Sequence, residues 1–462
     1  MPQFSKIELD FLKKYDKPGP RYTSYPTTPL FSGEFTENEY EEEIINTNAK
    51  ENFPDLSLYF HFPYCDTLCY FCGCTMLVTH DREKIKKYNK HIKKEVDLIL
   101  PRISRSRKVS QLHWGGGTPS YLTPDEIREV GVYVKERFNF APDIEASVEI
   151  DPRDLTFEHM QAFAESGFNR VSMGVQDVNP VVQKAINRIQ PMELTQSAVD
   201  WSRKLGFKSI NIDLIYGLPY QTKDTFSKTL DAVIELSPDR FAVFNYAHVP
   251  WMKKHQQVIP SEALPGPEEK LKTLTMTIEK LTSAGYWYIG MDHFAKPDDE
   301  LSMAQKEKTL YRNFQGYSTK AGCDVYAFGM SAISQFTDIY AQNVKTVKEY
   351  SQRIEEGRLA THVGYRMTPD DHIRKQTIMS LMCHLEIDKH LVSQRFNIDF
   401  DDYFTDSINK LKPFEEDGLI TIKPGKIEIA ELGKLVIRNI AMCFDAYLDK
   451  IPSSKPVFSR TV

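Results

Sequence analysis

From residue 57 to residue 284 the sequence repeats one pattern. A short apolar run predicts a strand, a turn follows, and the next segment carries apolar residues at helical spacing. We count six such strand–helix units. Strands that alternate with helices at this rhythm form a parallel sheet covered by helices. Because six units fall short of a closed (β/α)8 barrel, the sequence predicts an α/β fold built on a partial (β/α)6 TIM-like barrel.

The boundaries of these elements follow from turn and capping signals. A Thr-Pro-Asp-Glu run at 123–126 predicts a capping box with proline at the first helical position. The expected strands are 57–62, 109–114, 145–150, 170–175, 209–215 and 240–246. The expected helices are 82–100, 124–138, 156–166, 194–205, 222–236 and 268–284. Along helix 82–100 a run of lysines predicts a solvated face rather than a binding patch.

The rest of the chain is divided around this barrel. Residues 1–49 are expected to form an N-terminal arm, which contains the stiff stretch PGPRYTSYPT (18–27) and lies over the active site; a plain surface strap is the alternative. Residues 50–340 are assigned to the barrel, and within them 286–301 and 313–334 are predicted to be active-site walls rather than core. Residues 341–462 are expected to form a mostly helical C-terminal domain. There, helices 371–383, 401–414 and 431–448 and a hairpin around Pro424-Gly425 resemble a winged-helix module that serves as a lid or substrate wall.

Composition narrows the functional classes. The chain has 462 residues and a net charge of −6, which does not favour general nucleic-acid binding. No apolar run approaches the length of a membrane span, and the N-terminus lacks the pattern of a signal peptide. We therefore expect a soluble cytoplasmic protein with reduced thiols. Cys323, Cys383 and Cys443 are isolated and are expected to be small buried apolar residues.

The stretch 57–75, SLYFHFPYCDTLCYFCGCT, contains four of the seven cysteines: Cys65, Cys69, Cys72 and Cys74. A disulfide framework does not fit a long chain that is otherwise poor in cysteine. A structural zinc site usually takes two separated ligand pairs, and no second pair follows at the expected spacing. Closely spaced thiolates on one loop can instead hold an iron–sulfur cluster. Three thiolates on a four-iron cluster leave one iron open, which is a mark of chemistry rather than scaffolding.

Polar or glycine-rich residues follow nearly every expected strand. The carboxyl ends of parallel strands meet at one face of a barrel, so these residues are expected to line one ligand-filled mouth. The Gly115–Pro119 run, GGGTP, matches neither a Rossmann nor a Walker loop, and its glycines allow a backbone to approach a ligand closely. Asp151 and Asp177 are alternatively explained as turn formers. The residues at the strand ends are Cys65, Gly115–Thr118, Glu149, Asp151, Gln176, Asp177, Asp213, Ala247 and His248.

The run CDTLCYFC (65–72) resembles the signature of the radical S-adenosylmethionine (SAM) superfamily, in which SAM chelates the open iron. Further stretches resemble one family within it, the oxygen-independent coproporphyrinogen III oxidases, over essentially the whole chain. They include PRYTSYPT, LHWGGGTPS, VEIDPR, NRVSMGVQD, NIDLIYGLP, VFNYAHVP, IGMDHFAKPDDEL and NFQGYSTKAGCDVYAFGMSAIS. Cys74 and the arm with Arg21 distinguish this family from its haem-chaperone paralogue, which typically lacks both.

The resemblance implies a role for each of a set of residues. Cys65, Cys69 and Cys72 would ligate a [4Fe–4S] cluster, whereas Cys74 would not be a ligand and, with Arg21, would act in catalysis. Two SAM molecules are implied. The cluster-bound SAM would be lined by Tyr59, Gly116, Glu149 and Ile333. The second SAM would be contacted by Phe71, Gly117, Thr118, Gln176, Arg188, Asp213 and Ala247.

The implied reaction is the oxidative decarboxylation of two propionates of coproporphyrinogen III to vinyl groups through a 5′-deoxyadenosyl radical, which gives protoporphyrinogen IX for haem biosynthesis. The implied partners are this substrate and a low-potential electron donor such as flavodoxin, with no nucleic acid or membrane, and the chain is expected to be a monomer. Two alternatives remain at this point. One is a haem or porphyrin carrier without oxidase activity, and the other is a zinc-stabilised structural barrel.

Overall fold

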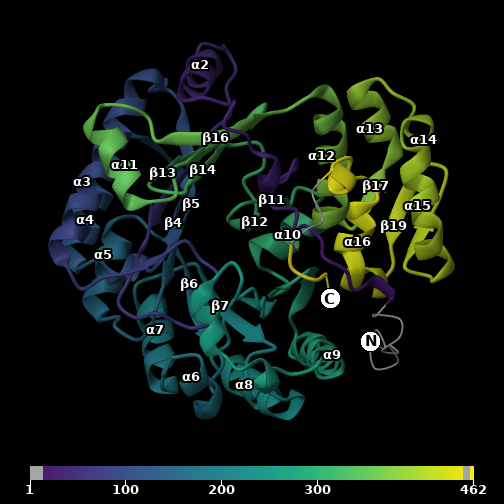
Figure 1. The fold of residues 1–462 in the computed structure, drawn as a ribbon, viewed down its shortest axis with the longest axis horizontal. Helices are drawn as coiled ribbons and strands as arrows, with labels where there is room; N and C mark the ends of the chain where they lie inside the picture. Colours follow the sequence, from purple (N-terminus) through teal and green to yellow (C-terminus); the bar gives the residue numbers. More distant parts are fainter. Residues whose placement is uncertain (1–13, 451–457, 462) are drawn as a thin grey trace.

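A computed structural model describes residues 14–450 and 458–461. Its centre is a curved sheet of twelve strands, drawn in Figure 1 with helices around its outer face. The order across the sheet is β16 (Thr361–Arg366), β15 (Ile339–Asn343), β14 (Ile333–Gln335), β13 (Asp324–Phe328), β1 (Leu56–Phe62), β4 (Lys108–Gly116), β5 (Asn139–Ile150), β6 (Arg170–Gln176), β7 (Ser209–Tyr216), β8 (Arg240–Asn245), β10 (His293–Ala295) and β9 (Trp287–Gly290).

The six predicted strand–helix units are confirmed. Strands β1, β4, β5, β6, β7 and β8 pair in parallel in that order. The helices that connect them are α3 (Arg82–Ile99), α4 (Pro124–Arg137), α5 (Phe157–Glu165), α6 (Pro180–Ala185), α7 (Met192–Lys204), α8 (Lys223–Glu235) and α9 (Pro267–Ser283). The barrel stays open because β1 and β8 do not pair with each other: β1 pairs with β13 and β8 pairs with β10, and the sheet ends at β16 and β9. The partial-barrel fold class is therefore confirmed.

Local sequence explains where these helices begin and which face they bury. At the start of α4 the Thr123 hydroxyl accepts from the Glu126 amide at 3.3 Å, and the Glu126 carboxylate accepts from the Thr123 amide at 2.9 Å, which is the predicted capping box. On α3 the buried stripe is Ile85, Tyr88, Ile92, Val96 and Ile99. Its lysines are exposed or half-buried, as predicted for a solvated face.

One part of the predicted active-site wall belongs to the core. Within 313–334, β13 is buried along its whole length and pairs in parallel with β1, so it adds a seventh parallel strand to the barrel. The glycines of this stretch suggested a loop. They lie before and after Asp324–Phe328, so they leave the strand itself unbroken. The predicted boundary at residue 340 falls inside β15, and the same sheet continues through β16 to Arg366.

The C-terminal part contains α12 (Pro369–His384), β17 (Glu386–Asp388), α13 (Lys389–Phe396), α14 (Phe400–Tyr403), α15 (Thr405–Glu416), β18 (Ile420–Ile422), β19 (Lys426–Ile429) and α16 (Ile437–Met442). The predicted hairpin is confirmed, and β17 joins it as a third strand. The predicted helix 401–414 is divided at Phe404. The predicted helix 431–448 is wrong: a 3-10 helix (Leu432–Val436) precedes the short α16. There Gly433 packs so closely on the backbone that a Cβ would lie 2.1 Å from the Leu419 carbonyl oxygen.

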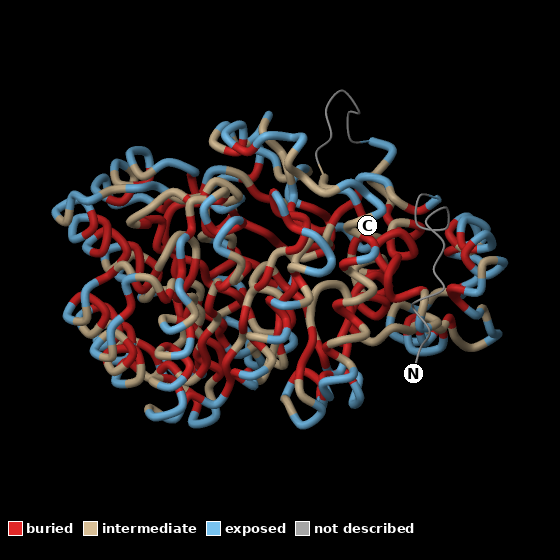
Figure 2. The backbone as a smooth tube through the Cα atoms, turned by 90° about the horizontal axis from the view of Figure 1, so that it is seen from below, coloured by how far each residue is buried: buried red, intermediate tan, exposed pale blue. Residues whose placement is uncertain are grey.

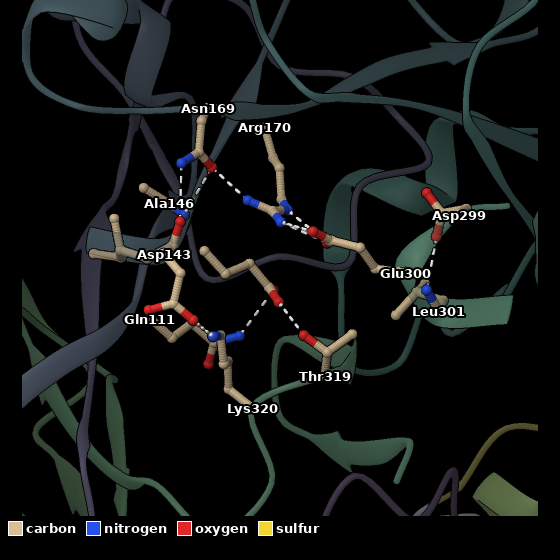
Figure 3. Close-up of polar contacts among 12 residues, drawn as sticks. Gln111, Asp143, Ala146, Asn169, Arg170, Asp299, Glu300, Leu301, Thr319 and Lys320 are labelled. Carbon is tan, nitrogen blue, oxygen red and sulfur yellow. Dashed lines mark hydrogen bonds and ion pairs between the residues drawn. The ribbon is translucent and has the colours of Figure 1, made fainter. Parts of the chain in front are cut away.

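The base of the barrel, at the amino ends of the strands, is crossed by charged contacts (Figure 3). Arg170, which begins β6, pairs with Glu300 at the start of α10 (Glu300–Lys306) and also donates to Asn169. From the opposite side Lys320 pairs with Asp143 at 3.0 Å. These contacts cross the end of the barrel away from the cysteines, and the Glu300 and Asp143 side chains remain 49% and 79% exposed.

The N-terminal arm crosses from the C-terminal part to the sheet (Figure 1). Its stretch 18–27 is irregular, as predicted, and helix α2 (Glu37–Asn48) follows. The first thirteen residues of the expected arm lie outside the described residues. Arg438 of α16 donates to the Pro20 carbonyl at 3.0 Å and to the Arg460 carbonyl at 3.0 Å. The arm and the C-terminal tail are thus held by one buried side chain.

Buried residues run through the interior of the molecule, and exposed ones lie on its outer turns (Figure 2). Cys383 and Cys443 are buried, as predicted, whereas Cys323 is only half-buried, because it lies in the turn before β13 rather than in a packed element. Among the residues that the structure describes, no helix is both long enough and apolar enough to cross a membrane.

Candidate active site

The cysteine loop leaves the carboxyl end of β1. Strand β2 (Tyr64–Cys65) pairs with β3 (Leu77–Val78), and the remaining three cysteines lie between them. Cys65 and Cys69 are buried, Cys72 is half-buried and Cys74 is exposed. The structure therefore places all four thiols on one loop at the mouth of the barrel, where the sequence predicted them.

Other loops at the mouth hold the backbone of this loop. The Tyr70 amide donates to the Ile186 carbonyl at 3.0 Å. The Gln256 side chain donates to the Phe71 carbonyl at 2.9 Å, and Lys253 donates to the Cys74 carbonyl at 2.8 Å. The positions of the thiols are thus set by residues more than a hundred positions away in the sequence.

Hydrogen-bond donors converge on three of the sulfurs. The Thr118 hydroxyl lies 3.1 Å from Cys65 Sγ, and Arg188 Nη1 lies 3.6 Å from Cys69 Sγ. The backbone amide of Cys74 donates to Cys72 Sγ at 3.4 Å. Donors of this kind stabilise negative charge on sulfur, so they fit thiolate ligands of an iron–sulfur cluster. Each of the three predicted ligands receives at least one donor.

A single bound metal ion does not fit the site. In residues 14–450 and 458–461, no three His, Cys, Asp or Glu side chains are grouped so that they could hold one ion. The three thiols nevertheless share one loop, and a four-iron cluster is larger than one ion.

The glycine run beside the cysteine loop brings backbone and carboxylate together. Gly116 has a φ of 114°, which favours glycine, and its amide donates to Glu149 at 3.1 Å. The Gly117 amide donates to the Phe62 carbonyl at 2.7 Å, and the Thr118 amide to the Tyr64 carbonyl at 3.0 Å. The first amide therefore faces the barrel interior, while the next two fasten the glycine run to the cysteine loop.

Glu149, at the end of β5, remains a carboxylate inside the barrel. Burial opposes its charge, but His113, the Gly116 amide and His61 together hold the pKa of Glu149 below its usual value. The nearest side-chain contact is His113 Nε2 at 3.3 Å. A half-exposed carboxylate that is kept charged in this way, and that a ligand in the barrel could still reach, is suited to an ammonium group.

Two histidines near this carboxylate were not identified from the sequence. His61 lies 3.0 Å from the Tyr59 hydroxyl, and His113 stacks on the Tyr59 ring with centroids 5.8 Å apart. Both positions follow the alternation of β1 and β4, since every second residue of a barrel strand points inward. That alternation would have identified them.

Asp213, on β7, lies in the same interior. It accepts from Asn211 at 2.7 Å and from Ser172 at 3.1 Å. Burial, followed by the charge of Glu149, raises the pKa of Asp213 to about 7. The charge of Glu149 also acts on Tyr59 and Cys74, so the structure brings these four predicted residues into one electrostatic group.

Arg188 connects the cysteine loop to the strand ends. Besides Cys69 it pairs with Asp151 at 2.9 Å and donates to the Gly174 carbonyl at 2.6 Å. Asp151 also pairs with Arg153 at 2.7 Å, so it is more than a turn former. Asp177, by contrast, accepts from the Asn179 amide and the Thr229 hydroxyl at 2.7 Å each and is a structural turn residue.

Polar atoms remain buried without partners at this site. Among the described residues, Oε1 of Gln176 and Nε of Arg188 have no hydrogen-bond partner. Gln176 also has a φ of 69°, in the left-handed region. Because orphaned buried polar atoms are costly, these two predicted residues fit a site that is completed by a ligand.

The remaining predicted residues lie around the edges of this group. Phe71 packs against a small buried cluster with Val182, and Ala247 follows β8. Ile333 begins β14 and is half-buried. Three strands, β13, β1 and β4, separate β14 from β5, which carries Glu149.

Arg21 lies on the arm, apart from the cysteine loop. It pairs with Asp292 between β9 and β10 and lies over the Phe244 ring, 5.6 Å from its centroid. Burial and the charges of Arg438 and Arg312 lower the pKa of Arg21 to about 9, so the side chain is still a cation at neutral pH. The sequence identified Arg21 but neither of the other two arginines.

A pocket of about 680 Å³ opens beside Arg21, between the end of β8, α9, the arm and the C-terminal tail. This volume lies within the range of small-molecule sites. Ala247, Tyr216 and Trp251 contribute to its wall. Five basic side chains also line it: Arg21, Lys270, Lys434, Arg438 and Arg460. Two carboxylates, Asp16 and Asp292, also line the pocket and pair with Arg460 and Arg21. Basic groups remain in excess, so the pocket suits a large ligand with an apolar body and negative charge.

Comparisons with known proteins agree with this geometry. Residues 59–233 match the family model of the radical SAM superfamily, and residues 367–436 match that of the HemN C-terminal domain. An oxygen-independent coproporphyrinogen III oxidase from Helicobacter pylori (strain J99) is 45% identical over 443 residues, which are 96% of this chain and 97% of that one. The protein of the same name from Escherichia coli (strain K12) is 44% identical over 98% of both chains. The chain belongs to the oxygen-independent coproporphyrinogen III oxidase family.

A solved structure extends the likeness to three dimensions. Coproporphyrinogen III oxidase (HemN) from Escherichia coli, described as a radical SAM enzyme, superposes with a TM-score of 0.91 at 44% identity and covers 96% of this chain and 99% of that one. Membership in the radical SAM superfamily implies a [4Fe–4S] cluster and SAM as cofactors. The thiols, their donors and the charged Glu149 fit that pair.

Proposed function

We propose that the protein catalyses the oxygen-independent oxidative decarboxylation of two propionates of coproporphyrinogen III, which gives protoporphyrinogen IX. The observation that carries the proposal is that three thiols lie together with the glycine run at one mouth of the barrel, and that each thiol has a hydrogen-bond donor beside it. The names of relatives that cover nearly the whole chain support the same reaction and do not favour the carrier alternative.

The proposed cluster ligands are Cys65, Cys69 and Cys72. Bound to them, a reduced [4Fe–4S] cluster with SAM on its open iron would supply the carbon radical that removes a hydrogen atom from the substrate. Glu149 would hold the ammonium group of this SAM, because His113 and the Gly116 amide keep the carboxylate charged. Tyr59, Gly116 and Ile333 would line the same molecule.

A second SAM site is proposed beside the first. Gln176 and Arg188 support it, since each has a buried polar atom without a partner among the described residues. Asp213 is within electrostatic reach of Glu149 and would bind a hydroxyl or ammonium group. The other residues proposed to contact this molecule are Phe71, Gly117, Thr118 and Ala247.

The pocket beside Arg21 is the proposed entry for the substrate. Coproporphyrinogen III carries four carboxylates around an apolar ring system, which suits the basic and apolar lining. Arg312 lies within electrostatic reach of Arg21 and Arg438, and its Nε and Nη1 have no hydrogen-bond partner in the part of the chain that the structure describes. We therefore assign carboxylate binding to Arg21 and Arg312. Cys74, next to the cluster loop, is proposed to act in turnover rather than as a ligand.

The chain's own contribution is positioning and the exclusion of water. The base of the barrel is crossed by the pair of Arg170 with Glu300 and that of Lys320 with Asp143. The arm is fastened over the side by Arg438. The reaction also needs a low-potential electron donor such as flavodoxin. We propose that the protein acts as a monomer, which sedimentation of the purified protein tests.

Anaerobic turnover tests the proposal. The reconstituted protein is incubated with dithionite, SAM and coproporphyrinogen III, and the products are separated by chromatography. We expect protoporphyrinogen IX together with 5′-deoxyadenosine and methionine, and none of them with Cys69→Ala. Stoichiometric binding of haem or porphyrin without vinyl product or 5′-deoxyadenosine would contradict the oxidase and favour a carrier.

A further inference from the structure

Exposed apolar side chains gather on the loops that surround the cysteine loop. Ile189 is 67% exposed, Met252 60%, Val181 59%, Val258 56% and Tyr220 53%. They come from α6 and the residues after it, from the turn between β7 and α8, and from the segment after β8. We name these five residues the loop face.

The packing beneath these residues shows that their segments converge. Val182, Ile186, Leu218 and Ile259, each within three positions of a loop-face residue, form one small buried cluster separate from the main core. Tyr70 and Phe71 of the cysteine loop pack against that same cluster. The loop face is therefore the outer side of the layer that supports the cysteines, and an apolar patch of this kind marks an interaction site.

The charge of these segments is opposite to that of the whole protein. Residues 179–191, 217–223 and 247–261 contain five Lys or Arg and no Asp or Glu, although the chain has a net charge of −6. Among the described residues, no carboxylate forms an ion pair with the exposed side chains of Lys184, Lys223 or Lys254, although the Glu269 carboxylate accepts from the Lys223 backbone amide at 2.6 Å. On α3, by contrast, Lys86 and Lys93 pair with Glu83 and Glu129. Unpaired lysines around an apolar centre attract an acidic partner.

The loop face also lies close to the sulfurs. Ile189 directly follows Arg188, whose guanidinium is 3.6 Å from Cys69 Sγ. The neighbouring residue Asn187 donates to the Leu68 carbonyl at 2.8 Å. The loop face is therefore continuous in the chain with residues that contact the cysteine loop directly.

We propose that the loop face, with Lys184, Lys223 and Lys254 at its rim, docks a small acidic electron-transfer protein whose redox group is exposed at its surface. This inference rests on the proposed function, in which the iron–sulfur cluster must receive electrons from a donor. In the docked complex the donor's reduced redox group would give up one electron to the iron–sulfur cluster that the three thiols would hold, and no atom would be transferred. The apolar residues would exclude water at the centre while the lysines pair with carboxylates at the rim.

Binding and cluster reduction test this surface independently of turnover. The probe is a bacterial flavodoxin, and an acidic plant-type ferredoxin is the second probe. The variants are the triple charge reversal Lys184→Glu, Lys223→Glu, Lys254→Glu and the double apolar change Ile189→Ser, Val258→Ser. The matched controls are Lys348→Glu with Lys412→Glu, which are exposed lysines on α11 (Val347–Glu355) and α15, and Leu391→Ser on α13, where the side chain is 53% exposed. Titration calorimetry measures binding, and stopped-flow absorbance measures anaerobic reduction of the cluster.

For the charge reversal we expect binding and protein-driven cluster reduction to fall by about tenfold or more at low salt. For the apolar pair we expect a similar loss that depends little on salt. Cluster content, and reduction and turnover driven by dithionite, should match the wild type in all variants. The proposal is overturned if the wild type binds neither probe, or if the variants bind and are reduced like the controls. Loss of dithionite-driven turnover in the wild type would instead contradict the proposed function and leave the binding result standing.

Discussion

Gly117 offers a direct test of how the glycine run supports the cysteine loop. A Cβ at this position would lie 2.5 Å from the Pro63 carbonyl oxygen and 2.9 Å from that of Phe62. Both carbonyls belong to the stretch that leads into Cys65, and the Pro63 carbonyl already accepts from the Leu77 amide at 2.8 Å. Gly117→Ala therefore forces a side chain into the contact between the two loops.

The size of the effect follows from that distance. An ordinary Cβ contact begins near 3.4 Å, so the two backbones must separate by about 0.9 Å, the difference between 3.4 and 2.5 Å. Overpacking of this kind costs about 1–3 kcal/mol in the free energy of unfolding. A displacement on the order of 1 Å near reacting groups lowers turnover by about 100-fold. We expect Gly117→Ala to fold, to retain less iron after reconstitution and to lose most of its turnover.

The assay compares Gly117→Ala with Gly73→Ala, which is on the cysteine loop itself. A Cβ on Gly73 meets no heavy atom within 4 Å, so this variant should keep the iron content, urea midpoint and turnover of the wild type. Identical iron content and stability in the two variants would refute the argument that the glycine run supports the cysteine loop by close backbone contact.

Three further predictions concern the thiols and the buried charges. Cys69→Ala should abolish cluster binding, whereas Cys74→Ala should keep the iron and lose turnover; equal iron loss in both would overturn the three-ligand assignment. Asp324→Asn should lower the free energy of unfolding by about 3–5 kcal/mol in urea denaturation, because it leaves the fully buried Arg107 without its ion-pair partner at 2.6 Å. Burial raises the pKa of Glu95 to about 7, above its usual 4.5. The folded state then holds a proton that the unfolded state releases, so this group costs about 3 kcal/mol of stability as pH rises from 4.5 to 7. Urea denaturation of Glu95→Gln should show a smaller loss over that range, and an unchanged pH dependence would refute the assignment.

Much of the fold could be predicted from the sequence, because helix caps and apolar stripes depend on only a few neighbouring residues. The capping box at 123–126 and the apolar stripe of α3 need only the chain that contains them. Prediction from local patterns failed where contacts between distant residues determine the secondary structure. Instead of the helix expected at 431–448, a 3-10 helix (Leu432–Val436) precedes the short α16, and Gly433 lies against the Leu419 carbonyl, a contact that no local pattern contains.

Some residues of the candidate site could likewise be predicted from local sequence, and others could not. The four thiols, the glycine run and the strand-end carboxylates could be named from spacing, since a loop after a strand must lie at the barrel mouth. Asp151 was given a turn role because its partners Arg153 and Arg188 come together only in the folded chain. Arg312 was missed because an arginine in a short strand gives no sign that its guanidinium is buried among other cations.

The sequence by itself determined the alternation of strands and helices, the loop that carries the thiols and the family to which the chain belongs, because each depends on residues close together in the chain. Only the tertiary structure decided that β13 completes the parallel strands beside β1, that Arg438 fastens the arm and the tail, and that three distant loops form an apolar, basic surface over the cysteines. The physical reason is that pairing, burial and the pKa of a buried group depend on which side chains are neighbours in space, and separation along the chain does not specify those neighbours.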